Sequence, residues 1–227
     1  QLNGSLAEHQ TGLSLLHRRG SMRLSAEDAW GEQGWQARLD GGGIALPGQH
    51  WLMVTPATLS VARDGDAHLS AHCWGWAGAR FCSADQRLNP APSLQLAIAD
   101  LPARAFRPWL PPSFRWEETL DARVALELSE QGPRGQAWVD AGSGRVAMRR
   151  PVDPDNLDAE VDEEEDGQAW QWVPFDYDRL RLAADLSPER TRLTADLAGP
   201  ELGQLDLDAD LEPLTEGMPV DARLKLE

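Results

Sequence analysis

The two cysteines of the sequence and two nearby histidines form its densest group of side chains that could do chemistry. Cys73 and Cys82 are separated by eight residues, two of which are glycine. This is the length of a short hairpin, so the two thiols could face each other across paired strands. We therefore expect a disulfide, which forms in oxidising compartments, and keep two free thiols in a reducing cytosol as the alternative.

His68 and His72 raise a further alternative, because cysteine and histidine side chains are the usual ligands of zinc. In a strand these two histidines would share a face but lie about 13 Å apart, which is too far to bind one ion. A helix would bring them together, but the residues around His72 are not typical of a helix. We therefore expect no bound metal here.

The sequence contains no recognisable catalytic or cofactor-binding motif. A nucleophile elbow, a phosphate loop and a dinucleotide-binding fingerprint are all absent. Gly41-Gly42-Gly43 precedes residues that are not typical of a helix, so it predicts a turn rather than a phosphate site. The tryptophans could stack on ligands, but packing in a core or at its rim is their commoner role. We expect a protein that is not an enzyme, with no catalytic residues and no cofactor.

Residues 158–166 form the most acidic stretch of the chain, with seven acids in nine positions. A charge run this dense predicts a solvated, mobile loop. A calcium site is the alternative, but the stretch lacks the Asp-x-Asp-x-Asp-Gly spacing that folds carboxylates around one ion.

The charge of the chain limits its possible partners. A formal net charge of −16 opposes binding to nucleic acid and docking on anionic lipid headgroups, since both would be repelled. No segment approaches the roughly 18–20 apolar residues that span a bilayer. The sequence starts at Gln1 with no signal-like segment. We expect one segment of a longer protein whose membrane anchor lies outside this chain.

Alternation with period two is the main secondary-structure signal. In residues 120–128 the even-numbered positions are all aliphatic, whereas Asp121, Arg123 and Glu127 occupy odd positions. Such alternation predicts a strand with one buried face. The same pattern recurs in residues 180–186, 193–197, 205–211 and 220–226. Less regular strands are predicted at Leu13–Leu15, Met22–Leu24, Gln36–Asp40, Thr58–Ala62 and Leu69–Ala71.

These strands recur about every 12 residues and predict a mainly β fold, a long antiparallel meander of about 11–14 strands. At about 4.8 Å per strand such a sheet is too long to stay flat, so we expect residues 1–227 to form a single sheet that folds over.

One short helix is predicted near residues 101–109. Asp100 is suited to an N-cap, and Pro102 lies near the first helical position. Leu101, Ala105, Phe106 and Trp109 would then lie on one apolar stripe facing the sheet.

Three segments in order resemble the TamB family, the inner-membrane subunits of the translocation and assembly module within the AsmA-like superfamily. Cys73-Trp74 and Phe81-Cys82 resemble the family's cysteine hairpin. The proline-bounded segment 99–111 resembles its short helix, and 119–129 resembles the strand that follows. Glu118-Thr119 stands where the family usually has glycine, and the resemblance covers roughly residues 50–226.

The resemblance implies a β-taco, a long sheet folded lengthwise so that its apolar face lines a groove open along one side. It also implies a place in the bacterial periplasm, an inner-membrane anchor outside this chain, and a TamA-like outer-membrane β-barrel as partner. Phospholipid acyl chains would lie in the groove during transport between the two membranes. The residues expected to line it are Leu120, Ala122, Val124, Leu126, Leu128, Leu180, Leu182, Leu193, Leu205 and Leu207.

Two other functions remain open. The first is a scaffold or chaperone for the assembly of outer-membrane β-barrel proteins, in which an open strand edge pairs with incoming strands. The second is a purely structural domain whose apolar face is an ordinary core. The lipid path depends on the side chains of the apolar face, whereas the scaffold depends on backbone edges.

Deleting residues 158–166 tests the loop prediction. We expect the thermal midpoint of unfolding to change by no more than a few degrees, because a segment this densely charged can bury little apolar area in a core. Thermal unfolding followed by circular dichroism measures the effect. A larger fall would mean that the stretch is a structural element.

Overall fold

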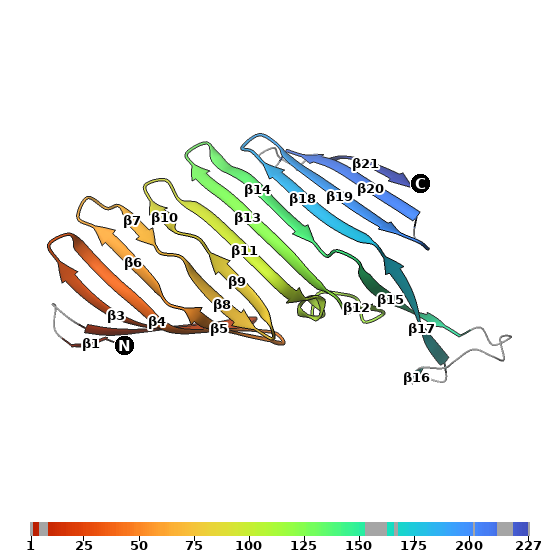
Figure 1. Ribbon diagram of the computed structural model, residues 1–227, viewed down its shortest axis with the longest axis horizontal. Coiled ribbons are helices and arrows are strands. Elements are labelled where there is room, and N and C mark those ends of the chain that lie inside the picture. The colour runs from red at the N-terminus through yellow and green to blue at the C-terminus, as the bar shows by residue number, and fades with distance from the viewer. Residues whose placement is uncertain are drawn as a thin grey trace.

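A computed structural model describes residues 2–4, 9–152, 163–165, 168–201, 203–212 and 220–226. The described chain is built almost entirely from strands, as the alternation predicts (Figure 1). The strands are β1 (Leu2–Gly4), β2 (His9–His17), β3 (Gly20–Gly31), β4 (Gly34–Leu46), β5 (Gln49–Thr55), β6 (Ala57–Ala62), β7 (Ala67–Leu69), β8 (His72–Trp76), β9 (Ala79–Ser83), β10 (Gln86–Asn89), β11 (Ser93–Pro102), β12 (Phe114–Trp116), β13 (Thr119–Ser129), β14 (Gly132–Asp140), β15 (Gly144–Pro151), β16 (Glu163–Glu165), β17 (Gln168–Tyr177), β18 (Arg179–Leu186), β19 (Thr191–Gly199), β20 (Gly203–Leu211) and β21 (Val220–Leu226).

The main sheet is an open antiparallel meander. It contains 17 strands, which follow one another across the sheet in chain order (Figure 1). Three positions hold two short strands in line, β5 with β6, β7 with β8, and β9 with β10, so the 17 strands occupy 14 positions. The predicted long meander is therefore confirmed, and the sheet does not close into a barrel within the described residues.

A crease crosses the N-terminal part of the sheet. The hydrogen-bond ladder between strands is interrupted in five consecutive positions of the sheet, and the interruptions lie side by side. They occur at Ser25–Ala26 in β3, at Asp40 in β4, and between the two short strands that share each of the next three positions. Asp40 is an extra residue in its strand, because Ser25 pairs with Gly41 while Ala26 pairs with Leu39. Such bulges bend and twist a sheet locally. The crease lets this long sheet depart from flatness.

Side chains replace ladder hydrogen bonds along the crease. Ser25 Oγ donates to Asp40 Oδ1 at 3.0 Å. Ser70 Oγ accepts from the backbone N–H of Thr58 at 2.7 Å, and Asp85 Oδ1 accepts from the backbone N–H of Ala71 at 3.0 Å. Backbone groups need partners wherever regular pairing fails, so these short polar residues stabilise the bend.

The predicted turn at Gly41-Gly42-Gly43 is wrong, since all three glycines lie inside β4. The close approach of another side chain explains them better. A Cβ atom on Gly42 would lie 2.7 Å from the indole of Trp74, which is 32 residues further along the chain in β8. Glycine therefore makes room here for a buried tryptophan.

The second sheet extends three strands of the main one. Its order is β12-β15-β17-β16. The pairing of β14 with β18 and that of β15 with β17 keep one register, from Asp140 opposite Arg181 to Gly144 opposite Tyr177. The two pairs thus form one long hairpin that projects past the main sheet (Figure 1). Of the acidic stretch, Glu163–Glu165 form β16 beside β17, and 158–162 and 166 lie outside the described residues, so its mobility stays a prediction.

The predicted helix is shorter and begins later than expected. Only Ala103–Phe106 is helical, as one 3₁₀ turn, η1. Asp100 is not its N-cap, because β11 continues through Pro102 and pairs Leu101 with Leu120. Tertiary pairing thus overrides the local capping signal. Trp109, expected on the apolar stripe, is 57 % exposed.

The core lies where η1 and the second sheet meet the main sheet. Its buried members are Trp51, Trp74, Ala79, Leu101, Ala105, Leu120, Ala141 and Tyr177. The ring of Phe106 stacks on that of Trp116 with centroids 6.2 Å apart. Gln49 Nε2 donates to the carbonyl of Ala105 at 2.9 Å, which fixes η1 on β5.

Tyr177, at the end of β17, is buried in this core and hydrogen-bonded to β12 within the second sheet. Its hydroxyl accepts from Trp116 Nε1 at 2.9 Å, and burial raises the pKa of the phenol, so it stays neutral. We expect Tyr177→Phe to lower the free energy of unfolding by about 1–3 kcal/mol, because the indole N–H loses its partner. Urea denaturation measures the change. Leu16→Ala, at a 90 % exposed position, is the control, and equal stability of the two variants would contradict the role given to this bond.

Candidate functional site: an apolar face on a single sheet

The alternation of β13 is reproduced in the burial of its side chains. Leu120 and Ala122 are buried and Val124 and Leu126 half-buried, whereas the odd-numbered residues from Thr119 to Ser129 are exposed. Burial decreases along the strand, from 3 % exposure at Leu120 to 50 % at Leu128. The strand is therefore covered at the end near the core and open at the other.

Residues directly opposite in antiparallel strands share a face, so the register shows how far the apolar surface extends. One row crosses nine strands from β8 to β21 and contains only apolar residues. Its members are Trp74, Phe81, Ile98, Ala122, Val139, Leu182, Ala195, Leu207 and Leu224. At about 4.8 Å per strand the row is roughly 40 Å long.

Neighbouring rows continue the same surface. One contains Leu96, Val124, Ala137, Ala184, Leu193, Ala209 and Ala222, and another contains Leu180, Leu197, Leu205 and Leu226. We call the surface formed by these three rows and the adjoining Leu94, Leu120, Leu126 and Leu128 the apolar face. The structure thus brings all ten predicted lining residues onto one face. Their contact with lipid stays a prediction.

Much of the apolar face is exposed. Leu182, Leu193 and Leu224 are 43 %, 36 % and 59 % exposed, so no second layer of described residues covers them. The backbone groups beneath are paired within the ladder, and the side chains of the nine-strand row offer no hydrogen-bond donor other than the indole of buried Trp74. An extended surface of this kind is rare on soluble proteins without a binding role.

The opposite face is polar and held by ion pairs between strands. Arg181 Nε donates to Asp140 at 2.9 Å, and Arg192 pairs with Asp208. Arg179 donates to Asp196, and this hydrogen bond holds the pKa of that carboxyl below its usual range. The hydrogen bond from Arg190 likewise lowers the pKa of Asp210. Each of these four arginines pairs with an aspartate, and this face is suited to water.

The predicted disulfide is confirmed. Cys73 and Cys82 are directly opposite in β8 and β9 and are bonded to each other on the polar side of the sheet, since their neighbours Trp74 and Phe81 lie on the apolar face. His72 Nδ1 lies 3.0 Å from the carbonyl of Ser70. Both sulfurs are used in the bond, so the cysteines present no thiolate to a metal.

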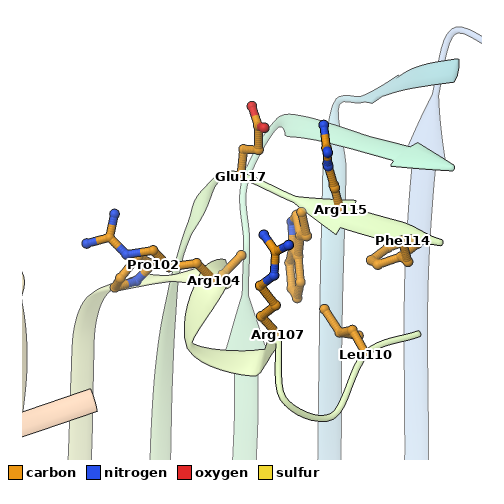
Figure 2. Close-up of a pocket in the computed structure, with 9 residues that line it drawn as sticks. Pro102, Arg104, Arg107, Leu110, Phe114, Arg115 and Glu117 are labelled. Carbon is orange, nitrogen blue, oxygen red and sulfur yellow. The ribbon is translucent and has the colours of Figure 1, made fainter. Parts of the chain in front are cut away.

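Two polar features were not predicted from the sequence. His9 pairs with Asp28, which is buried in β3. Their register, His9 opposite Asp28, could only have been found once the pairing of β2 with β3 was known. The second feature is a pocket of about 350 Å³ beside η1, to which Arg104, Arg107 and Arg115 all contribute (Figure 2).

No group of three or more His, Cys, Asp or Glu side chains among the described residues could hold a metal ion. No helix of the described part is long and apolar enough to cross a membrane.

Comparison with known proteins gives one match. A model of the family described as TamB, N-terminal domain, matches residues 1–227. No curated protein and no solved structure matches the chain.

Removing the disulfide tests whether it supports the sheet from the polar side. We expect Cys73→Ala with Cys82→Ala to lower the free energy of unfolding by about 2–3 kcal/mol, because the unfolded chain gains entropy. Urea denaturation measures this, and reduced wild-type protein should match the variant. Two free thiols per chain under denaturing, non-reducing conditions would contradict the bond itself.

Proposed function

Since the chain belongs to the TamB family, which is anchored in the inner membrane and lies in the periplasm, we propose that its apolar face is part of a path for phospholipid acyl chains. The path runs between the inner and outer membranes. The chain acts without catalysing a reaction and without a cofactor, and its membrane anchor belongs to a part of the protein outside residues 1–227.

The observation that supports this proposal most directly is the unbroken nine-strand row of apolar residues, with exposed leucines at its open side. Burial of an acyl chain on such a surface contributes about 0.8 kcal/mol per methylene group. Because the exposed part of the row is uniformly aliphatic, no position along it holds a chain much more tightly than the next. A lipid could therefore move along the face in small steps.

The polar face and the disulfide also support this proposal. Ion pairs on the outer side keep that surface in water while lipid occupies the inner side. A disulfide is stable in an oxidising compartment such as the periplasm. Family membership also implies association with TamA-like partners in general, and we propose that parts of the full-length protein make the contact with this outer-membrane β-barrel.

One observation favours a second function, the assembly of outer-membrane β-barrel proteins. Among the described strands, β21 pairs only with β20, so its outer edge is available for pairing with another strand. An edge of this kind could template an incoming strand by β-augmentation. This function depends on the backbone of β21 and not on the leucines of the apolar face.

Photo-crosslinking from the two faces of β13 separates these functions. We expect crosslinking residues at positions 124 and 126 to capture phospholipid in cells, because Val124 and Leu126 lie on the apolar face. The same residue at 123 and 127, which replaces the exposed Arg123 and Glu127, is the matched control and should capture none. Mass spectrometry of the adducts identifies the lipid. Equal capture from both faces, or none from either, would reject the lipid path.

A further inference from the structure

The pocket beside η1 has a composition unlike the rest of the apolar side. It is lined by Pro102, Ala103, Arg104, Arg107, Leu110, Phe114, Arg115, Trp116 and Glu117. Three of these side chains are cationic and one is anionic, and the remainder are apolar. Residues 101–116 contain no acid at all, in a chain with 37 acids and 21 basic residues. The pocket is thus locally positive in an acidic protein.

Two of the three arginines lack a carboxylate partner. On the polar face Arg179, Arg181, Arg190 and Arg192 each pair with an aspartate. Arg104 and Arg107, by contrast, form no ion pair with any described residue, although acids are abundant in the chain. Figure 2 shows Arg107 rising from the end of η1 toward Arg115 and Glu117, while Arg104 extends away from them.

Aromatic rings hold two of the guanidinium groups. The guanidinium carbon of Arg104 lies 5.8 Å from the ring centroid of Trp76, and that of Arg115 lies 3.8 Å from the ring of Trp172. Stacking uses the face of a guanidinium, whereas its N–H donors point outward in the plane. Arg104 therefore has an ordered position and donors without an ionic partner. Such arginines bind phosphoryl oxygens well.

The pocket adjoins the end of the apolar face. Trp76, which contacts Arg104, packs against the buried core together with Phe106 and Trp116. Leu120 and Leu101, at the covered end of the apolar face, belong to the same core. A lipid whose acyl chains lie on the apolar face could thus place its headgroup at η1. A volume of about 350 Å³ is at the lower end of the range for small-molecule pockets and suits a headgroup rather than a whole lipid.

We propose that the pocket beside η1 binds the phosphoryl group of an anionic phospholipid, to which Arg107 donates hydrogen bonds while Arg104 and Arg115 add positive charge around the pocket. This proposal rests on the proposed lipid path. It adds a contact with the lipid headgroup that the aliphatic side chains of the apolar face, which have no hydrogen-bond donors, cannot make. The net charge of −16 opposes adsorption of the whole chain to an anionic bilayer, so the site selects single lipid molecules already on the apolar face.

Binding of three soluble ligands to the 227-residue chain tests the proposal. They are dioctanoyl phosphatidylglycerol below its micelle concentration, dioctanoylglycerol, which has the same chains without the phosphate, and inorganic phosphate. We expect wild type to bind the phospholipid at least about tenfold more tightly than dioctanoylglycerol, the effect of charge-assisted hydrogen bonds. Arg104→Gln with Arg107→Gln should remove this preference and leave the affinity for dioctanoylglycerol unchanged.

The matched control is Arg18→Gln with Arg19→Gln, which removes the same charge at exposed positions between β2 and β3 and should keep the preference. Arg107→Gln alone is the second variant, since no aromatic contact of Arg107 is lost. It should weaken phospholipid binding in part, and circular dichroism verifies that each variant is folded.

Each of the remaining outcomes would overturn the headgroup site, and one of them would overturn the lipid path as well. Equal binding of the phospholipid and dioctanoylglycerol by wild type would overturn the headgroup site and leave the lipid path standing. Binding of neither would overturn the lipid path and the site with it. Binding of inorganic phosphate as tight as that of the phospholipid, lost in the double variant, would mark a site for free phosphate and overturn the headgroup role.

Discussion

Strand register is the constraint on which both faces of this sheet depend. Side chains alternate with period two, so a slip of one residue in any strand would put aspartates on the apolar face and leucines in water. Several contacts oppose such a slip. The disulfide joins β8 to β9 covalently. Ion pairs join β14 to β18, β18 to β19, and β19 to β20, through Arg181, Arg179 and Arg192. Exposed ion pairs add little stability singly, but a shifted register would lose them together with apolar burial.

The apolar side chains are covered at one end of the strands and exposed at the other. At one end, η1 and the second sheet cover Leu120 and Tyr177 with stacked aromatic rings. At the other end the side chains become progressively more exposed, as at Leu128. In the N-terminal part the crease bends the sheet instead, with hydrogen bonds from serine and aspartate side chains in place of the ladder. The fold thus covers the apolar face near η1 and leaves much of the rest of it open.

Local patterns predicted the parts of this structure that depend on local chemistry. The alternation in residues 120–128 anticipated β13 to within a residue at each end, and the spacing of Cys73 and Cys82 anticipated their bond. The errors arose where a distant segment decides the conformation. Asp100 and Pro102 carry helix-start signals, yet pairing with β13 extends β11 past Asp100 to Pro102.

The triple glycine shows the same limit, because its role in β4 depends on the indole of Trp74. The pairing of His9 with Asp28 and the grouping of Arg104 with Arg115 also require contacts between separate segments. None of these contacts between distant segments produces a periodic pattern in the sequence. The apolar face could be predicted because its residues are periodic, whereas the arginine pocket could not.

The chain-order arrangement of strands has a consequence for how such proteins can change in size. Each position in the main sheet is hydrogen-bonded only to the positions on either side of it, so the cross-section is set by strand length and not by strand number. Adding or removing one hairpin would alter the long dimension by about 10 Å and leave the strand pairing elsewhere in the sheet as it is. The length of such a sheet along its stacking direction can therefore change during evolution, one hairpin at a time, without any change in its cross-section.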